Sequence, residues 1–251
     1  MTDTTGELSD QVALVTGASR RIGRAIALGL AREGAAVVVH AQSSRKEVEA
    51  VAAEIRRQGG KSIAVLGDIT REDEVVRIFE EARQGLGDVR ILVNNAAIRG
   101  QADFLEMTLE EWRHIHAVIL EGAFLCSREA LRGMMGTGGG TIVNIGGVSA
   151  HIGAKSRAHV SAAKAGIVGL TKALALEFAN RGVTVNCIAP GKIGGHRSAS
   201  AGASPDMGAG PILGRSGEVE EAAYMAVSLC RPGARFTTGQ TIHVSGGMYM
   251  P

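Results

Sequence analysis

The sequence predicts a single α/β domain built on a doubly wound parallel sheet of about seven strands. Short apolar, β-branched runs alternate with longer amphipathic patterns along all 251 residues, and no linker or shift in composition divides the chain. A glycine-rich turn joins the first apolar run to the first helical pattern. Strands that are apolar throughout are typical of a parallel sheet covered by helices on both faces. Such a Rossmann-like sheet binds its ligand at the carboxyl ends of its strands.

Each element is expected where its periodicity and its flanking breakers place it. Strands are expected at Val12–Thr16, Ala36–His40, Ser62–Leu66, Ile91–Asn94, Thr141–Ile145, Thr184–Ile188 and Thr241–Val244. Helices are expected at Ile22–Glu33, Arg45–Gln58, Arg71–Gly85, Thr108–Met135, Ala158–Asn180 and Glu218–Leu229.

The turn between the first strand and the first helix has the composition of a phosphate cradle. Residues 16–23 read Thr-Gly-Ala-Ser-Arg-Arg-Ile-Gly. Glycines allow the backbone to approach a pyrophosphate, and the free N–H groups of the first helical turn favour its negative charge. Six residues of this turn are therefore expected to bind a dinucleotide: Gly17, Ser19, Arg20, Arg21, Ile22 and Gly23.

Composition narrows the function classes. Hydrophobic residues make up 45% and charged residues 21% of the chain, and the net charge is +2 without a basic tract. No nucleic-acid partner is therefore expected. No apolar stretch approaches the ~20 residues that span a bilayer, so we expect no membrane partner and a cytoplasmic location. The three cysteines are far apart and are expected to be buried thiols, and no His/Cys/Asp spacing predicts a metal site.

Five motifs, in order and over nearly the whole chain, resemble the short-chain dehydrogenase/reductase family. Residues 16–23 resemble its TGxxxGIG loop, Asn94-Asn95-Ala96-Ala97 its NNAG motif, and Pro190-Gly191 its PG turn. Asp68 matches the acid that the family places beside the adenine. The ending, residues 239–249, is similar to that of 3-oxoacyl carrier-protein reductases. The resemblance implies an oxidoreductase that acts on a small carbonyl or alcohol substrate with a nicotinamide cofactor.

The same resemblance implies which residues outside the glycine-rich turn bind the cofactor. They are His40, Ser43, Ser44, Asp68, Ile69, Asn95, Ala96, Lys164, Pro190, Gly191 and Ile193.

The end of the second strand indicates which nicotinamide is used. An acid at that point binds the ribose hydroxyls of NAD, but residues 40–45 contain no carboxylate. Ser43, Ser44, Arg45 and Arg20 could instead hold a 2′-phosphate by charge-assisted hydrogen bonds. NADP is therefore favoured and NAD is the alternative. Arg45 has a second interpretation, as a solvated residue in the first turn of a surface helix.

Three of the four groups that the family uses for proton transfer are absent. The family's set is Asn, Ser, Tyr and Lys, of which Lys164 is present. Val160 stands at the tyrosine position, Gly147 at the serine position and Ile119 at the asparagine position. None of these three side chains can carry a proton, so the usual proton transfer needs a substitute.

The candidate catalytic residues are Lys164, His151 and Ser161. Ser161 lies three residues before Lys164 on one helix, and His151 follows Gly147 in a segment that touches substrate in the family. Ordinary surface or packing roles are the alternatives for Ser161 and His151. Three functions stay open: an NADP-dependent oxidoreductase with a rearranged proton donor, a non-redox lyase or hydrolase, and a catalytically silent cofactor-binding or assembly protein.

Two further expectations concern mobility and assembly. Residues 192–214 are rich in Gly, Ala and Ser, and are expected to form a flexible lid over the substrate, with a plain connector as the alternative. The two long helices carry more apolar positions than one core-facing stripe needs, among them Ala117, Leu120, Phe124, Ile167, Leu170 and Leu174. A homodimer or homotetramer is therefore expected.

Overall fold

A single seven-stranded sheet organises the protein. The computed structural model describes residues 6–195, 206–208 and 210–251. The strand order is β3-β2-β1-β4-β5-β6-β7, and all six neighbouring pairs are parallel. The chain winds outward from β1 to β3, returns past β1 to β4, and winds outward again. The predicted doubly wound sheet is confirmed, and its switch point lies between β1 and β4.

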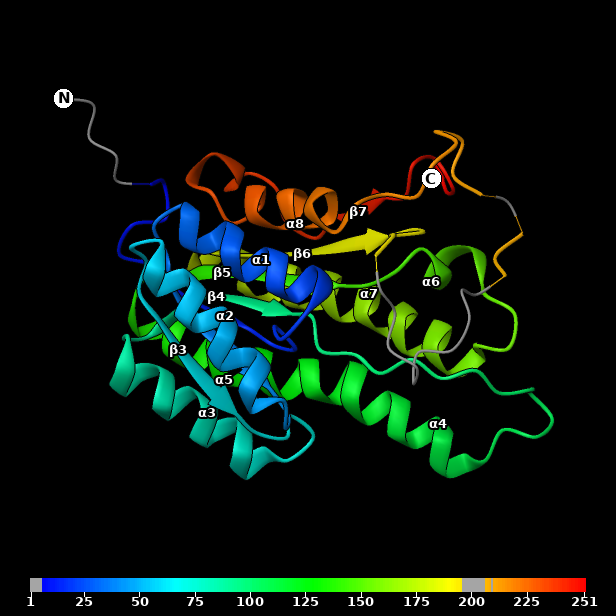
Figure 1. Ribbon diagram of the computed structural model, residues 1–251, viewed down its shortest axis with the longest axis horizontal. Coiled ribbons are helices and arrows are strands. Elements are labelled where there is room, and N and C mark those ends of the chain that lie inside the picture. The colour runs from blue at the N-terminus through cyan, green and yellow to red at the C-terminus, as the bar shows by residue number, and fades with distance from the viewer. Residues whose placement is uncertain (1–5, 196–205, 209) are drawn as a thin grey trace.

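The elements follow the predicted alternation (Figure 1). The strands are β1 Val12–Val15, β2 Ala36–Ala41, β3 Ser62–Leu66, β4 Val89–Asn94, β5 Gly140–Ile145, β6 Val183–Pro190 and β7 Thr241–Val244. The helices are α1 Arg21–Arg32, α2 Arg45–Arg57, α3 Glu72–Gly85, α4 Leu109–His116, α5 Gly122–Gly136, α6 Ser149–Ile152, α7 Ala158–Phe178 and α8 Val219–Ser228. Short 3₁₀ turns occupy Ala179–Arg181 and Pro232–Ala234.

Helices cover both faces of the sheet because successive strand residues point to opposite sides. In β1, Ala13 and Val15 pack into the core under α1, α2 and α8, whereas Val12 and Leu14 pack into the core under α3, α5 and the end of α7. β2 and β4 divide their side chains in the same way. The sheet is therefore buried on both faces, as its continuous apolar strands predict.

Two local features differ from the predicted elements. The helix expected over Thr108–Met135 is divided into α4 and α5 by a π-helical segment, Ala117–Glu121. The short helix α6 was not predicted, because four residues carry no readable periodicity. The other expected elements are present, and most of their ends differ by one or two residues.

A ladder of buried amides crosses the centre of the sheet. The Asn94 amide donates to the Asn144 Oδ1 atom at 2.9 Å, and the Asn144 amide donates to the Thr171 hydroxyl at 2.9 Å. The Asn94 amide also donates to the Ser127 hydroxyl at 3.0 Å. Buried polar groups that are paired in this way fix the relative positions of β4, β5 and the helices behind them. Among the described residues, no helix is both long enough and apolar enough to cross a membrane.

Candidate active site

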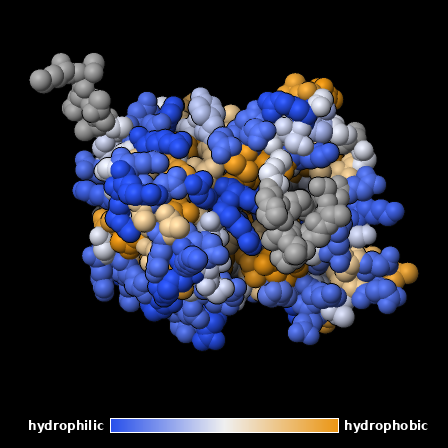
Figure 2. All heavy atoms as spheres, viewed as in Figure 1, coloured by the Kyte–Doolittle hydropathy of each residue, from blue (hydrophilic) through white to orange (hydrophobic). Residues whose placement is uncertain are grey.

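A long crevice runs along the carboxyl ends of the strands, at the switch point where such sheets bind ligands. It comprises an outer cavity of about 590 Å³ beside β2 and β3, and an inner cavity of about 410 Å³ beside β5, β6 and α7. The strand arrows in Figure 1 point toward this end of the molecule. On the face shown in Figure 2, hydrophobic residues form several separate patches, one of them near the middle, on a largely hydrophilic surface. Six residues line both cavities: Arg21, Ile22, Asn95, Ala97, Ile98 and Arg99.

The glycine-rich turn lies against the end of β4. Gly17 has a φ angle of +63°, and a Cβ atom there would lie 2.9 Å from the Ala96 Cα atom. The Asn95 amide donates to the carbonyls of Thr16 and Gly17 at 2.8 and 2.9 Å. A Cβ atom on Gly23 would lie 2.4 Å from that same amide nitrogen. Glycine is needed at both positions because the turn and β4 approach so closely.

Helix α1 begins at this turn with an open N-terminus. Its N-cap residue, Arg20, makes no side-chain capping bond, and its first turn contains no acidic residue. The N–H groups of the first turn therefore have no side-chain cap and can bind an anion.

The turn departs from the family motif at one position, Arg21, so its match to that motif is incomplete. Arg21 stands where TGxxxGIG has its second glycine, and its φ angle is +51°. This left-handed conformation costs a non-glycine residue roughly 1 kcal/mol. The guanidinium of Arg21 donates to the carbonyls of Ile193 and Gly194, at 3.3 and 3.0 Å. An arginine therefore joins the two walls of the crevice where the family pattern has no side chain.

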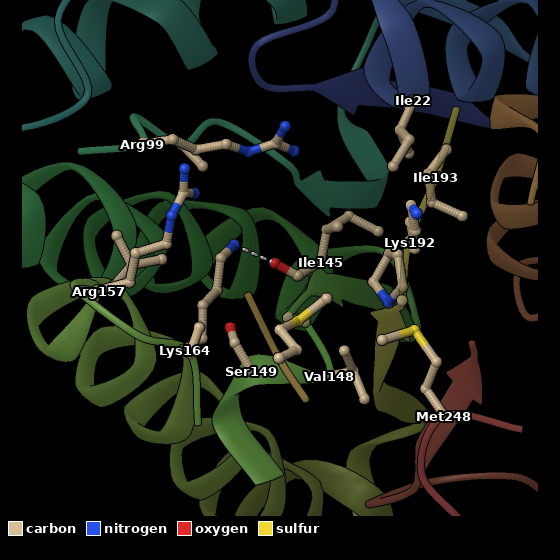
Figure 3. Close-up of a pocket in the computed structure, with 18 of the residues that line it drawn as sticks. Ile22, Arg99, Ile145, Val148, Ser149, Arg157, Lys164, Lys192, Ile193 and Met248 are labelled. Carbon is tan, nitrogen blue, oxygen red and sulfur yellow. Dashed lines mark hydrogen bonds between the residues drawn. The ribbon is translucent and has the colours of Figure 1, made fainter. Parts of the chain in front are cut away.

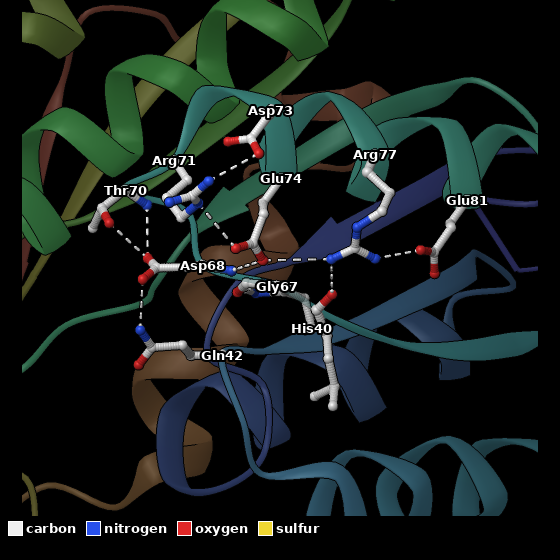
Figure 4. A network of polar contacts seen from close by, with 11 residues as sticks. His40, Gln42, Gly67, Asp68, Thr70, Arg71, Asp73, Glu74, Arg77 and Glu81 are labelled. Carbon is white, nitrogen blue, oxygen red and sulfur yellow. Dashed lines mark hydrogen bonds and ion pairs between the residues drawn. The ribbon is translucent and has the colours of Figure 1, made fainter.

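Asp68 is the centre of a polar network at the outer end of the crevice (Figure 4). Its carboxylate accepts hydrogen bonds from the Thr70 N–H and hydroxyl and from the Gln42 amide, at 2.8 to 2.9 Å. Partial burial alone would raise the pKa of Asp68, but these hydrogen bonds outweigh it and lower the pKa. The carboxylate is therefore ionised and fixed in position at the edge of the outer cavity.

His40 lines the same cavity and is neutral. Its ring is 1% exposed, and its Nε2 atom lies 2.9 Å from the Gly67 carbonyl. Burial lowers the pKa of His40 to about 4, although the bond to Gly67 opposes this shift. Since a carbonyl can only accept, Nε2 carries the hydrogen at neutral pH. Arg45 does not line either cavity and pairs with Glu49 at 3.3 Å on α2, in agreement with its surface interpretation.

The residues expected to bind the cofactor all line the crevice, although binding itself stays a prediction. The outer cavity contains Gly17, Ser19, Arg20, Arg21, Ile22, Gly23, His40, Ser43, Ser44, Asp68, Ile69, Asn95 and Ala96. The inner cavity contains Lys164, Pro190, Gly191 and Ile193.

Lys164 projects from α7 into the inner cavity (Figure 3). Lys164 is 8% exposed, and its ammonium group donates a hydrogen bond to the Ile145 carbonyl at the end of β5. Burial, followed by the nearby charge of Arg99, lowers the pKa of Lys164 to about 8. An amine with such a pKa exchanges protons near neutrality, which an ordinary lysine does not.

None of the three residues that replace the family's proton-transfer groups can give Lys164 a proton or take one from it. Val160 lies one turn before Lys164 and lines the inner cavity, as does Gly147. Ile119 is 2% exposed and packs in the same apolar cluster as Val160. It lies within the π-helical segment, a feature that is frequent at functional sites even though no amide is present here.

The other two candidate catalytic residues, His151 and Ser161, do not line the inner cavity, so this placement lends them no support and their catalytic role stays a prediction. His151 lies on α6, and its ring packs against His243 and Tyr249 with centroid distances of 4.5 and 5.0 Å. The unpredicted turn of α6 directs this ring toward β7 and the chain end. Ser161 follows Val160 by one residue, and successive helix residues point about 100° apart. Its hydroxyl is buried without a hydrogen-bond partner among the described residues.

Ser149, Arg99 and Arg157 line the inner cavity and were not among the candidates. Ser149 lies two residues after Gly147, and its Oγ atom is 3.7 Å from the position of a Cβ atom on Gly147. It therefore offers a hydroxyl close to the place where the family has its serine. Arg99 follows the NNAG-like segment, and Arg157 is the N-cap of α7. Three positive charges facing one cavity have no signature in a linear sequence, since β4, α7 and their loops bring them together.

The described cysteines and metal-binding side chains suggest no further chemistry. Cys126, Cys187 and Cys230 are free and buried, as expected. Within the described ranges, no group of three or more His, Cys, Asp or Glu side chains is arranged to hold a metal ion.

Comparison with known proteins agrees with the architecture. The profile of the family described as Enoyl-(Acyl carrier protein) reductase matches residues 17–249. The chain is 42% identical to 3-oxoacyl-[acyl-carrier-protein] reductase of Synechocystis sp., over 97% of this chain and 98% of the relative. It is 40% identical to 3-oxoacyl-[acyl-carrier-protein] reductase FabG of Staphylococcus aureus, over 95% and 98%.

A solved structure extends this agreement to three dimensions. The crystal structure of a putative short-chain alcohol dehydrogenase from Sinorhizobium meliloti superposes with a TM-score of 0.87 at 33% identity, covering 98% of each chain. A family match over residues 17–249, relatives that are 40% and 42% identical over nearly their whole length, and a similar fold in a solved structure agree with one another. The chain belongs to the short-chain dehydrogenase/reductase family of oxidoreductases.

Proposed function

We propose that this protein is an NADP(H)-dependent reductase of a small carbonyl compound, in which Lys164 supplies the proton. The observation that carries the proposal is the placement of Lys164. Of the three candidate catalytic side chains, it is the one that lines the inner cavity, and it lies at the carboxyl end of β5. The curated relatives are named as reductases of a carbonyl-containing acyl group, which supports the same reaction type.

The crevice fits a dinucleotide. The close approach of Gly17 and Gly23 to β4 and the uncapped N-terminus of α1 provide room and N–H donors for a pyrophosphate. A nicotinamide bound in the crevice would supply the hydride. Lys164, Pro190 and Gly191 would hold its reactive end beside the inner cavity, and Asp68 would lie beside the adenine.

The outer cavity favours the phosphorylated form of the cofactor. The β2 strand ends without a carboxylate, and Arg20, Ser43 and Ser44 line the cavity there. Asp68, an acid that lines the same cavity, is hydrogen bonded to Thr70 and Gln42 and faces them. A 2′-phosphate would therefore meet a cation and two hydroxyls at the end of β2.

Lys164 and Ser149 divide the roles of the missing groups. As the carbonyl carbon gains a hydride, its oxygen gains negative charge, and the Lys164 ammonium transfers a proton to that oxygen to give the alcohol. The neutral amine then regains a proton from water. The Ser149 hydroxyl is placed to donate a hydrogen bond to the same oxygen, close to the position of the family's serine.

Part of the expected lid contributes to the inner cavity. Lys192, Ile193 and Asp206 to Gly208 line it, and the Lys155 N–H donates to the Asp206 carbonyl at 3.1 Å. Residues 196–205 and 209 of the lid lie outside the described residues. We propose that residues 192–214 close over the substrate and exclude water from Lys164.

The test combines cofactor binding with turnover. NADPH and NADH are titrated into the protein, and NADPH oxidation is then followed across a panel of ketones, aldehydes and 2- and 3-oxo acids. Lys164→Met should abolish turnover, while Lys172→Met, an exposed lysine two turns later on α7, should leave it unchanged. NADPH binding without turnover on any member of the panel would contradict the proposal.

A further inference from the structure

Lys164 differs from every other lysine of the described residues because it is buried. It is 8% exposed and lines the inner cavity, whereas the other lysines are exposed. Its amine donates a hydrogen bond to the Ile145 carbonyl, and no ion pair of the described residues includes it. A neutral carbonyl does not hold an amine in its charged form as a carboxylate would.

The charge state of this amine suits attack on a carbonyl carbon. Burial, followed by the charge of Arg99, lowers the pKa of Lys164 to about 8. At pH 7 about a tenth of the molecules therefore carry the neutral amine, against roughly 0.04% for a lysine of ordinary pKa. Only the neutral form has the free electron pair that adds to a carbonyl, and burial beside a cation is a known way to activate a lysine.

The replaced proton-transfer positions give a substrate direct access to the amine. Val160 lies one turn before Lys164 and lines the same cavity without filling the space that a tyrosine ring would occupy. At Gly147, a Cβ atom would meet only the Ser149 Oγ atom, at 3.7 Å. Figure 3 shows the Lys164 side chain extending from α7 into the cavity. A small carbonyl compound can therefore approach the amine without displacing a phenol.

The cavity around the amine suits a compact and uncharged molecule. Its volume is about 410 Å³, near the lower end for ligand pockets. Much of its described lining is apolar: Ile98, Ile145, Val148, Val160, Ile193 and Met248. Imine formation releases a water molecule, and an apolar surrounding favours that release and slows the reverse hydrolysis.

Going beyond the proposed function, we propose that Lys164 captures small uncharged aldehydes as an imine. The electron pair of its neutral amine forms a bond to the carbonyl carbon, the π electron pair of the carbonyl moves to the oxygen, and a proton passes from nitrogen to oxygen. The new hydroxyl then takes up a proton and leaves as water, while the nitrogen electron pair forms the C=N bond. Overall, the ammonium and the aldehyde give a protonated imine and water, without an oxidant or a reductant. The protonated imine keeps one N–H, which can still donate to the Ile145 carbonyl.

The test traps the imine with sodium cyanoborohydride. The full chain is incubated with butanal at pH 7 without nucleotide, and the reagent reduces the imine to a stable butylamine. Peptide mass spectrometry then gives the rate of modification at each lysine. Lys164 should be modified at least tenfold faster than the exposed Lys155 and Lys172, because far more of it is neutral at this pH.

Variants show whether the surroundings of Lys164 cause this reactivity. Lys164→Arg keeps the charge but forms no imine with butanal, so the fast-reacting site should disappear. Arg99→Met removes a charge that disfavours the ammonium, and Val160→Tyr places a phenol beside the amine, so each should slow modification of Lys164 several-fold. Lys172→Arg, at an exposed position two turns later on α7, is the matched control and should leave the rate at Lys164 unchanged.

Modification of Lys164 no faster than that of Lys155 and Lys172 would overturn the proposal, and this comparison within the wild type holds even if a variant fails to fold. A rate at Lys164 that neither Arg99→Met nor Val160→Tyr lowers would also contradict it, because neither the charge state nor the open approach would then explain the reactivity. The reductase is tested separately, since it uses the ammonium as an acid together with a hydride from the nicotinamide. NADPH turnover can therefore persist where no imine forms, and an imine can form where NADPH turnover fails.

Discussion

The Arg21 guanidinium lies 3.0 Å from the Gly194 carbonyl, so the glycine-rich turn is tied directly to the segment that follows β6. This contact spans the crevice in which we place the cofactor. The residue that makes it has a φ angle of +51°, in the region that favours glycine. The protein thus retains a strained backbone position in exchange for a contact between the two crevice walls.

Arg21→Gly should remove this tie and the strain together. Losing the two hydrogen bonds should destabilise the protein by roughly 1 kcal/mol, and relieving the left-handed conformation should stabilise it by roughly 1 kcal/mol. The two effects offset each other, so the free energy of unfolding should change little. NADPH should dissociate several-fold faster because the segment at residues 193–194 is no longer held. Stopped-flow displacement measures this rate, and an unchanged rate would show that the tie does not control cofactor exchange. The exposed Arg83→Gln on α3 is the control for this test and should not change the dissociation rate. Arg32→Gly would not serve, because a glycine there would weaken α1.

The activity should decline in alkali if Lys164 is the proton donor. The ammonium form is the active acid, and burial together with the charge of Arg99 lowers the pKa of Lys164 to about 8. The kcat/KM for carbonyl reduction should therefore be constant below that pH and fall about tenfold per pH unit above it. Arg99→Met removes a positive charge that disfavours the ammonium, so the midpoint should move to higher pH. An unchanged midpoint would show that the charge of Arg99 does not affect the group that titrates.

The sheet and its crevice could be predicted from the sequence because the information for them is local. Strands rich in β-branched residues, such as β2 and β6, indicate burial on both faces, and the glycine turn identifies the phosphate-binding end. The positions of Asp68 and Asn95 in the crevice follow from the ends of β3 and β4. These predictions required only periodicity, turn chemistry and motif order.

The inner cavity could be predicted only in part, because its character arises from contacts between distant segments. The proximity of Arg99, Arg157 and Lys164 depends on how α7 packs beside β4 and β5. His151 was expected to face the substrate, but the four-residue helix α6 turns its ring toward His243. The sequence does not reveal the left-handed conformation of Arg21. The absence of the motif's second glycine at this position does indicate, however, that the turn differs from the family pattern.

Acid should destabilise the fold through its buried histidines. Burial lowers the pKa of His40 to about 4 and also lowers the pKa values of His151 and His243. A histidine whose folded pKa is depressed contributes stability that is present above its unfolded pKa and lost as pH falls toward the folded value. For His40 that window runs from about 6.5 to about 4 and corresponds to roughly 3 kcal/mol.

Urea unfolding between pH 7.5 and pH 4 tests this dependence. The wild-type protein should lose stability steadily below pH 6.5. His40→Gln, which can still donate to the Gly67 carbonyl, should be less stable at pH 7.5 but show a shallower slope below pH 6.5. A variant with the wild-type slope would indicate that carboxylates, and not His40, govern acid unfolding.

The predicted assembly has a candidate surface on α5 and α7. Phe124 is 46% exposed and Leu176 is 87% exposed, whereas the expected interface residue Ile167 is 2% exposed and belongs to the subunit's own core. Exposed apolar side chains on two neighbouring long helices are typical of a subunit interface. Light scattering at micromolar concentration should give a dimer or tetramer mass, and Phe124→Glu with Leu176→Glu should reduce it. A monomer mass for the wild type would contradict the prediction.

Restoring the missing groups tests whether their loss sets the catalytic rate. Gly147 does not have a positive φ angle, and a Cβ atom there would meet only the Ser149 Oγ atom at 3.7 Å, so Gly147→Ser fits without strain. Val160 lines the inner cavity, so the ring of Val160→Tyr can extend into it, one turn from Lys164. Ile119→Asn lies in the π-helical segment and introduces a buried amide, which makes it the least tolerated of the three.

The triple variant should reduce activated ketones faster than the parent, by up to the ~10²–10⁴-fold that positioned proton donation contributes. Each single variant should gain little, because such groups act as a unit. Adding Lys164→Met to the triple variant is the control and should remove the gain, since the tyrosine then lacks the neighbouring ammonium that lowers its pKa. A folded triple variant that binds NADPH and gains no rate would show that the cavity is shaped for a different substrate geometry.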